Sequence, residues 1–288
     1  MRRRELIAFL AAVLGDAAMR PGKARAQGQA KPAPAADHQV GEVATLQGSA
    51  TVTRGTAAPT ALKVSEAIFK NDALETGDNS SLGITFDDET TFSLSANAHI
   101  AVDEFVYQEG GKGNSAVFNI ARGTVAFVAS KVAKTGKMTI ATPTANLGIR
   151  GTTGVVDVPA DPAAGEATIK LYPDADGHVG RIQVFNRQGE LLGALTRGAS
   201  AFALRPGLGG RLIAAPFRIL PQIAARDRGM VRQLLTVHNI GRRLLIQRRQ
   251  LRIPNLRLPN LLQQPKSGRG RQQRGGLREK LQKLNPFR

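Results

Sequence analysis

The segment Met138–Thr152, MTIATPTANLGIRGT, and the alternating run Val155–Val158 after it decide the fold of this chain. Proline fixes its own φ angle and favours an extended conformation in the residue before it, so a short strand should run into Thr142 and Pro143. A polar turn follows, and Ile149–Thr152 should begin the next strand. None of these residues has an obvious chemical role. The segment therefore predicts architecture, two strands joined by a stiff corner, and a protein that binds or senses.

The same alternation of apolar with polar or small residues recurs from Val40 to Leu204, and turn-forming residues separate the runs. The alternating positions are Ala50/Val52, Leu82/Ile84/Phe86, Phe92/Leu94, Ile100/Val102, Phe118/Ile120, Val125/Phe127, Met138/Ile140, Val156/Val158, Ile169/Leu171, Ile182/Val184 and Phe202/Leu204. A period of two indicates strands with one buried face. Residues 40–204 are therefore predicted to form an all-β domain, a sandwich or roll or a short β-solenoid of many short strands.

The formal net charge of +18 is confined to one end of the chain. Residues 1–204 carry 20 Lys and Arg and 20 Asp and Glu, whereas residues 205–288 carry 20 Lys and Arg against only Asp227 and Glu279. The second segment is predicted to be a basic, low-complexity tail that is largely disordered. Residues 230–251 resemble a basic helix, but Gly241 interrupts it and its apolar residues spread widely around the helix. Only a transient or partner-induced helix is expected there.

The N-terminus has the three parts of an export signal. Arg2–Arg4 form a basic start, Leu6–Leu14 is an unbroken apolar run of nine residues, and Ala24, Ala26 and Gln27 mark an A-x-A cleavage site. The apolar run is too short to cross a bilayer, which needs about 20 residues. Residues 1–26 are therefore predicted to be a cleaved Sec or twin-arginine signal, followed by a linker over residues 27–39. The mature protein is expected in the periplasm or cell envelope.

Six motifs occur in a fixed order between residues 40 and 158. They are Gly41–Val43 with Gly48–Val52, Asn71–Gly77, Phe86–Glu89, Arg122–Val125, Thr142–Ala145 and Ile149–Thr152. Together they resemble the FecR domain, a bacterial periplasmic module. The positions that carry the resemblance are Asn71, Asp72, Thr76, Gly77, Asp87, Gly123, Thr142, Pro143, Arg150, Gly151 and Thr152.

The chain departs from the family pattern at two positions where glycine is usual, Asn71 and Asp88. Asn and Asp are the non-glycine residues that best tolerate a positive φ. Both are therefore interpreted as turn residues, so Asp88→Gly is expected to be close to neutral and Asp88→Val to destabilise the hairpin.

FecR-type regulators that relay iron–siderophore signals are similar in this domain. They also have a cytoplasmic sigma-factor-binding segment, a transmembrane helix and a C-terminal receptor-contacting domain. This chain has an export signal and a basic tail in those places. The resemblance therefore implies the domain and an envelope location, and does not imply the transduction mechanism.

Three polar clusters are candidates for chemistry. Asp87–Glu89 and Asp103–Glu104 could bind Ca²⁺ or act as glycosidase carboxylates, but a hairpin turn and a solvated strand end explain them better. Asp174–Gly177 resembles a fragment of a calcium loop and is interpreted as a turn, because the later ligands are missing. Arg150 could contact a ligand or partner, and is expected instead to pair with a turn carboxylate.

The remaining composition indicates no catalytic residue, metal site or cofactor. The absence of cysteine excludes disulfides, thiolate metal sites and cysteine nucleophiles. No two of the four histidines have metal-ligand spacing, and there is no Gly-x-Ser-x-Gly elbow.

The basic tail should attract polyanions, with Arg242, Arg243, Arg248 and Arg249 as candidate anion-binding residues. In the envelope the available polyanions are anionic lipids and acidic polysaccharides. We therefore expect a non-enzymatic FecR-domain protein that binds an envelope protein or glycan and associates with an anionic surface, without a small-molecule substrate. The alternatives are a polysaccharide-active β-solenoid enzyme that uses the acidic clusters, and a nucleic-acid-binding protein that uses the tail.

Overall fold

The computed structural model describes residues 38–161, 165–207 and 211–251. The chain divides into two compact units, Met1–His38 and Gln39–Arg288, and the described elements belong to the second. The predicted export signal, most of the predicted linker and residues 252–288 lie outside the described residues. None of the helices in the described part of the chain combines the length and the apolar character that crossing a bilayer requires.

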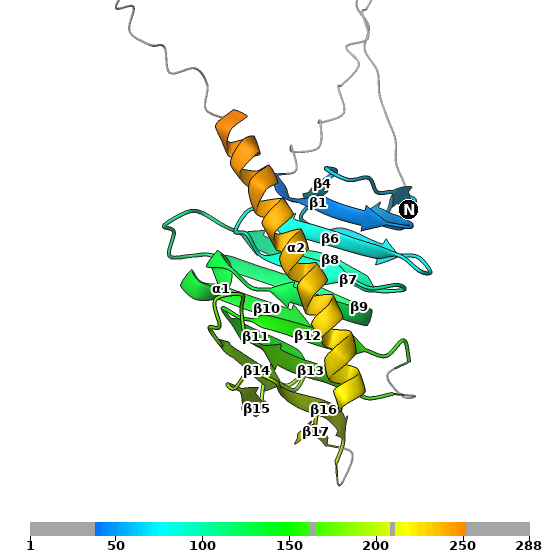
Figure 1. The fold of residues 1–288 in the computed structure, drawn as a ribbon, viewed down its shortest axis with the longest axis vertical. Helices are drawn as coiled ribbons and strands as arrows, with labels where there is room; N and C mark the ends of the chain where they lie inside the picture. The colour runs from blue at the N-terminus through cyan, green and yellow to red at the C-terminus, as the bar shows by residue number, and fades with distance from the viewer. Residues whose placement is uncertain (1–37, 162–164, 208–210, 252–288) are drawn as a thin grey trace, which may run out of the picture. The chain divides into compact units, whose positions relative to one another are not determined.

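Two β-sheets face each other across a shared core, which confirms the predicted all-β fold (Figure 1). Sheet A has the strand order β4 (Ala67–Phe69), β1 (Gln39–Gln47), β6 (Ser81–Phe86), β7 (Thr91–Leu94), the second part of β9 (Ser115–Val128), β12 (Thr153–Val158), β13 (Ala167–Tyr172), β16 (Ser200–Pro206) and β17 (Leu212–Pro216). Sheet B has the order β3 (Thr60–Ala61), β2 (Ala50–Arg54), β5 (Asp72–Thr76), β8 (His99–Val106), the first part of β9, β10 (Lys137–Ala141), β11 (Asn146–Arg150), β14 (Arg181–Phe185) and β15 (Leu191–Leu195).

Strand β9 belongs to both sheets. Its first part pairs with β8 and, in parallel, with β10, and its second part pairs with β7 and β12. The chain passes from one sheet to the other at Gly123, where φ is +93° and a Cβ would lie 2.5 Å from the Cα of Ala98. Only glycine fits both the backbone conformation and the space at this crossing.

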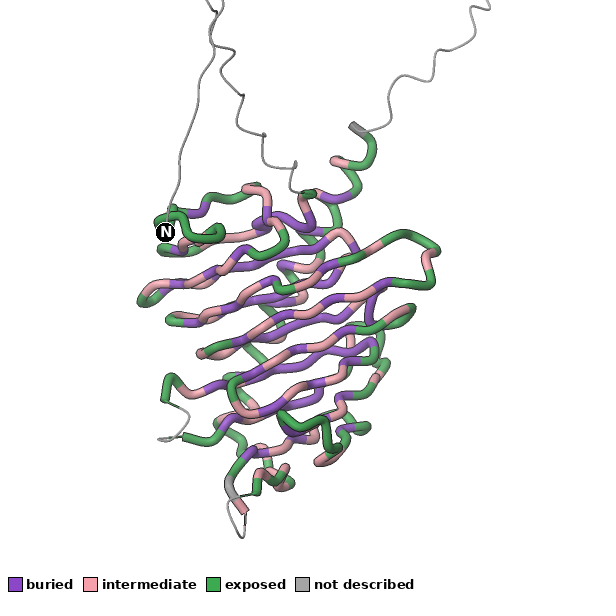
Figure 2. Tube along the Cα trace, turned by 180° about the vertical axis from the view of Figure 1, so that it is seen from behind, coloured by how far each residue is buried: buried purple, intermediate pink, exposed green. Residues whose placement is uncertain are grey.

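Buried residues alternate with less buried ones along many of the strands, as expected from the sequence (Figure 2). The buried apolar side chains form the core between the sheets. Phe118 of sheet B lies with its ring centroid 4.9 Å from that of Phe86 and 4.6 Å from that of Phe92, both in sheet A. These three phenylalanines are fully buried. Burial of one such side chain contributes about 1.5–3 kcal/mol, so the aromatic cluster is a main contact between the sheets.

The segment Met138–Thr152 forms a hairpin and then a crossing between sheets. Strands β10 and β11 are joined by a turn in which the Thr142 amide donates to the Ala145 carbonyl at 2.8 Å and the Ala145 amide donates to Thr142 Oγ1 at 3.0 Å. The new strand begins at Asn146, earlier than Ile149–Thr152 had suggested, and ends at Arg150. Gly151, with φ of +43°, then turns the chain from sheet B into sheet A.

The structure corrects the expectation that fixed structure ends at residue 204. Strand β16 runs to Pro206, β17 follows, and the long helix α2 (Pro221–Leu251) crosses the outer face of sheet A (Figure 1). The other helix of the described residues, α1 (Lys131–Thr135), connects β9 to β10. The partner that orders the basic helix is the chain's own sheet.

Helix α2 buries a single stripe of residues. These are Asp227, Leu234, Val237, Gly241 and Leu245, whose spacing of three, four or seven places them on one face of a helix. Two of the five are not apolar, which is why the apolar pattern alone indicated only a weakly amphipathic helix. Gly241 does not interrupt the helix, which continues to Leu251. A Cβ at position 241 would overlap the side chain of Thr85 on β6. Glycine lets the helix approach the sheet closely.

Candidate binding site

The outer face of sheet B is hollowed by a groove of about 550 Å³. Residues of β8, β9, β10, β11 and β14 line it. Strand register aligns five of these residues in one row across the sheet: Glu104, Val117, Thr139, Gly148 and Gln183. Gly148 has no side chain, so the row is lowest at its position, where the ring of Phe185 stands 3.4 Å from where a Cβ would be. The groove therefore runs across the strands.

Two further rows border the groove. On one side the register of β10, β11 and β14 places Lys137, Arg150 and Arg181 next to one another. We call these three residues the cationic row. On the other side lie Asn146 and Phe185, which are paired across β11 and β14. The groove thus presents a positive edge, a polar floor and an edge with an amide and an aromatic ring.

The outer face of sheet A is covered instead of open. Leu234, Val231 and Leu235 of α2 pack on Ala126, Val128 and Val155 of β9 and β12, and form a small apolar cluster separate from the main core. Polar contacts hold the helix on both sides of this cluster. They include His238 Nδ1, which lies 3.0 Å from the hydroxyl of Thr91.

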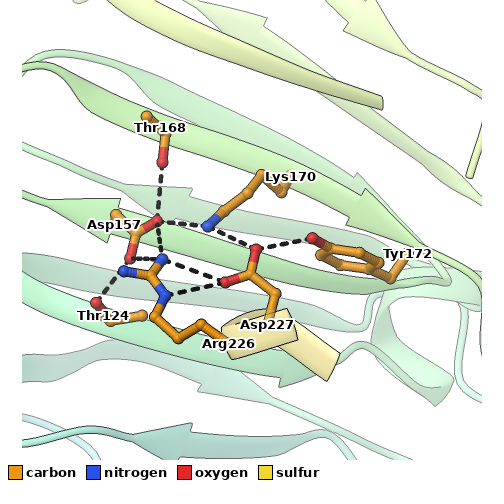
Figure 3. A network of polar contacts seen from close by, with 7 residues as sticks. All are labelled: Thr124, Asp157, Thr168, Lys170, Tyr172, Arg226 and Asp227. Atoms are coloured by element: carbon orange, nitrogen blue, oxygen red, sulfur yellow. Dashed lines mark hydrogen bonds and ion pairs between the residues drawn. The ribbon is translucent and has the colours of Figure 1, made fainter. Parts of the chain in front are cut away.

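A buried ionic network holds the first turns of α2 (Figure 3). Lys170 Nζ on β13 is 2.6 Å from Asp157 Oδ2 and 2.8 Å from Asp227 Oδ2, and Lys170 is only 1% exposed. Asp227, which is fully buried, also accepts a hydrogen bond of 2.7 Å from the Tyr172 hydroxyl. Arg226 lies 3.2 Å from both carboxylates. Two positive and two negative charges therefore balance.

The network shifts the titration of its members. Burial alone raises the pKa of Asp157, but hydrogen bonds from Lys170 and Thr124 and the positive charges of Lys170 and Arg226 outweigh it, so the pKa lies below its ordinary value. Burial and the neighbouring Asp227 carboxylate raise the pKa of Tyr172. The phenol of Tyr172 therefore stays a hydrogen-bond donor and the Asp157 carboxylate stays ionised at neutral pH.

The other end of α2 binds the hairpin between β6 and β7. Arg248 pairs with the Asp87 carboxylate, and Arg249 donates to the Asp87 carbonyl at 3.0 Å. Arg242 is 3.2 Å from Glu89. Three of the four arginines expected to bind external anions are thus engaged within the chain. Arg243 is exposed and is the fourth.

Asp88 is not a turn residue with positive φ. The positive φ of the hairpin belongs to Glu89, at +71°, whereas Asp88 is fully buried. Its carboxylate accepts hydrogen bonds from the Thr90 amide at 2.8 Å, the Thr90 hydroxyl at 2.6 Å and the Val132 amide at 3.0 Å. Burial raises the pKa of Asp88 despite these bonds. Asn71, by contrast, has φ of +66°, as the turn interpretation requires.

The other motif residues hold the fold together. Asp72 accepts the Phe69 amide at 2.9 Å and pairs with Arg54 at 3.2 Å, and the Thr76 hydroxyl donates to the Ser95 carbonyl at 2.6 Å. Gly77 leaves room that a Cβ would take from the side chain of Ser49. Pro143 occupies the β10–β11 turn. Thr152 is fully buried.

Arg150 does not pair with a turn carboxylate as expected. Its Nη1 donates to the Gly136 carbonyl at 2.6 Å, and the side chain is exposed. The strand order explains the difference, because β11 lies between β10 and β14, whose neighbouring positions carry Lys137 and Arg181.

The acidic clusters do not converge on a shared site. Asp174–Gly177 is a turn in which the Gly177 amide donates to the Asp174 carbonyl at 2.9 Å and Gly177 has φ of +82°. Asp103 is exposed on β8. Within the described residues, no group of three or more His, Cys, Asp or Glu side chains is arranged to hold a metal ion.

The residues that sequence reasoning missed are Lys170, Tyr172 and Asp227. Lys170 and Tyr172 sit in an ordinary alternating strand, so their pattern gave no signal. Asp227 gave one: it is the only acid between residues 205 and 278, in a segment otherwise rich in arginine. A lone acid of this kind in a basic helix indicates a specific buried partner.

Comparison with known proteins identifies the central part of the chain. Residues 72–170 match the family described as FecR protein. No curated protein gives a match. Two crystal structures of a candidate anti-sigma factor from Parabacteroides distasonis ATCC 8503 resemble the chain with TM-scores of 0.37 and 0.36 and identities of 8% and 9%.

Each of those alignments covers 51% of this chain and 60% of the other, so the chain spans less than two thirds of that protein. A likeness of this size does not extend to function. The family match runs from the start of β5 into β13, across the strands on both sides of β9. The resemblance seen in the motifs is thereby confirmed, and residues 72–170 carry the FecR domain of this chain.

Proposed function

We propose that this chain is a non-enzymatic regulatory or sensing protein of the cell envelope, and that its FecR domain binds an envelope protein or glycan in the groove on sheet B. One observation carries the proposal. Helix α2 covers the outer face of sheet A, whereas no described element covers the outer face of sheet B, which is hollowed by a groove of about 550 Å³. Concave sites with a few convergent polar groups are where proteins bind ligands.

The acidic clusters do not favour the enzymatic alternative. A glycosidase needs two carboxyl groups that face a substrate. Here the Asp87 carboxylate pairs with Arg248, Glu89 lies 2.9 Å from Lys131 and 3.2 Å from Arg242, and Asp88 is buried beneath them. These carboxylates stabilise the docking of α2 and α1, so the groove is the better candidate for function.

The outer face of α2 supports association with an anionic envelope surface. Arg228, Arg232 and Arg243 are exposed on the side opposite the buried stripe, with the exposed apolar residues Ile240 and Ile246 among them. The acid of the helix, Asp227, is buried and faces the sheet. A helix face that combines arginine with isolated apolar side chains suits the interface of an anionic lipid layer.

The groove is tested with a substitution that fills it. Gly148→Phe in the full chain should abolish binding to an envelope extract immobilised on a sensor surface, because the new ring occupies the lowest point of the groove. Gly229→Phe on the exposed face of α2, where a side chain meets no neighbour, is the matched control. Equal binding by both variants would place the recognition site elsewhere.

Localisation and the helix surface have separate tests. Mass spectrometry of the mature protein should find Gln27 as its first residue, and an intact Met1 in a cytoplasmic fraction would contradict export.

Arg228→Gln with Arg232→Gln should weaken flotation with vesicles containing phosphatidylglycerol, and added salt should weaken flotation of the wild type. Binding to neutral vesicles of the same strength would contradict an electrostatic role.

A further inference from the structure

The cationic row, Lys137, Arg150 and Arg181, is an unusual arrangement for neighbouring strands. Adjacent strands lie about 4.8 Å apart, so the three positive residues start from neighbouring points on the same face of sheet B. Arg150 and Arg181 are direct partners in the register of β11 and β14. Like charges directly opposite each other destabilise a sheet. Three positive residues in one row therefore indicate a role in binding, because they do not stabilise the sheet.

The charge of the row is not balanced within the described part of the chain. None of its three residues forms an ion pair with a described carboxylate, although thirteen other pairs of described residues with basic and acidic partners do occur, such as Arg122 with Glu75. The hydrogen bond from Arg150 goes to a neutral carbonyl, that of Gly136. Exposed side chains of this kind are available to an external anion.

The positive region continues beyond the row. Arg150 also lines a second cavity of about 520 Å³, whose other members include Lys134, Asp176 and His178. Asp176 is the one acid among the residues lining that cavity. Arg150 therefore lines both hollows, and its side chain is within reach of a ligand in the groove.

The opposite edge of the groove and its floor from β9 to β14 are neutral, and Glu104 on β8, at the far end of the floor, is the one acid among the lining residues. Asn146 and Gln183 carry amides, each with both donors and an acceptor, and Phe185 adds an aromatic face. Sugar hydroxyls also donate and accept, so amides match them in both roles. Arginine binds carboxylates in a bidentate manner. We propose that the groove binds an acidic polysaccharide, with its carboxylates on the cationic row and its hydroxyls on the amides.

The geometry disfavours other polyanions. An extended acidic peptide binds most readily by pairing its backbone with a sheet edge, whereas this groove crosses the strands on a face whose backbone groups are already paired. Single-stranded nucleic acid needs several aromatic side chains for base stacking, and Phe185 is the one aromatic residue that lines the groove. The inference rests on the proposed binding role of the groove and adds the class of ligand.

The test measures binding of the full chain to polygalacturonate, a polymer of carboxylated sugars, with dextran as the uncharged comparison. Wild type should bind polygalacturonate and not dextran. Arg150→Gln with Arg181→Gln should weaken binding by at least about tenfold, the loss expected for charge-assisted hydrogen bonds. Lys63→Gln with Lys70→Gln, at two exposed lysines before and after β4 that line neither hollow, removes the same charge and should leave binding within about twofold.

Arg181→Gln alone and Lys137→Gln alone repeat the test without touching the Arg150 hydrogen bond, in case the double variant fails to fold. Equal weakening by the variant with both Lys63→Gln and Lys70→Gln would show non-specific attraction and overturn the inference. Binding of dextran, or tighter row-dependent binding of a single-stranded oligonucleotide, would overturn it as well. If Gly148→Phe abolishes binding to the envelope extract while polygalacturonate does not bind wild type, the ligand class is refuted and the proposed function stands.

Discussion

Asp88 gives the sharpest test of the structure, because the turn interpretation and the structure predict opposite results for Asp88→Gly. A turn residue with positive φ would tolerate glycine with almost no cost. The structure instead shows a buried carboxylate that accepts three hydrogen bonds and joins the β6–β7 hairpin to the start of α1. The residue at the N-cap of α1, Ser130, makes no side-chain cap, so Asp88 satisfies the Val132 amide in its place.

The size of the loss in unfolding free energy follows from the hydrogen-bond donors that Asp88→Gly leaves without partners. Asp88→Gly removes the acceptors of two backbone amides, those of Thr90 and Val132, and each unsatisfied buried donor costs about 1–3 kcal/mol. The free energy of unfolding should therefore fall by about 2–6 kcal/mol. The lower half of this range is expected, because burial raises the pKa of Asp88 and the variant recovers the cost of burying its charge.

Urea unfolding followed by circular dichroism measures the difference, and Asn71→Gly is the matched control. Asn71 has φ of +66° and is exposed, so glycine should change the free energy of unfolding there by less than about 1 kcal/mol. The reasoning is refuted if Asp88→Gly has the same free energy of unfolding as wild type. It is also refuted if both variants lose the same free energy while the slope of that free energy against urea concentration stays unchanged.

Three further predictions concern α2 and the sheet beneath it. Asp227→Asn leaves the network of Lys170, Arg226 and Asp157 with one positive charge in excess and should cost about 3 kcal/mol in thermal unfolding, the lower end of the range for breaking a buried ion pair, because Asp157 stays beside Lys170. Lys170→Met combined with Asp227→Leu leaves Arg226 paired with Asp157 and should recover most of this loss, and strictly additive losses would contradict a coupled network. Gly241→Val should cost about 1–3 kcal/mol and increase proteolysis of the last helical turns, and Thr85→Gly should partly restore protection; no rescue would argue against this contact. The pKa of Asp157 is lowered by folding, so its contribution to stability is complete above the ordinary aspartate pKa and is lost as pH falls through the lower folded value. Asp157→Asn should therefore flatten the loss of stability below about pH 4, and an unchanged acid limb would contradict the assignment.

The strands were predictable because their signal is local. The apolar pairs Leu82/Ile84, Phe92/Leu94 and Met138/Ile140 all lie in strands with those residues buried. Alternation fixes which side chains face inwards, and turn residues separate the runs. It does not specify which strands are neighbours, so the double sheet joined by β9 could not be chosen over a solenoid.

The helix and the groove were missed for different physical reasons. The buried stripe of α2 contains Asp227 and Gly241, whose partners Lys170 and Thr85 are far away in the sequence. Their burial depends on tertiary contacts, so the helix looked weakly amphipathic. The groove depends on register across five strands, and no sequence pattern places Arg150 beside Arg181. Asp88 was misread because neighbouring residues of a hairpin have the same turn composition, and only the backbone shows that Glu89 adopts the positive φ.

Strand β9 has a consequence for how proteins of this architecture can differ in length. Its two parts hold the centre of both sheets, and each sheet continues outwards from it strand by strand to β4 and β17 in one and to β3 and β15 in the other. Loss or duplication of an outermost strand would therefore leave every hydrogen bond between the central strands in place. The region matched to the family, residues 72–170, consists of the inner strands of both sheets. The pairing of this sheet system thus permits changes of length at its two ends without any change at its centre.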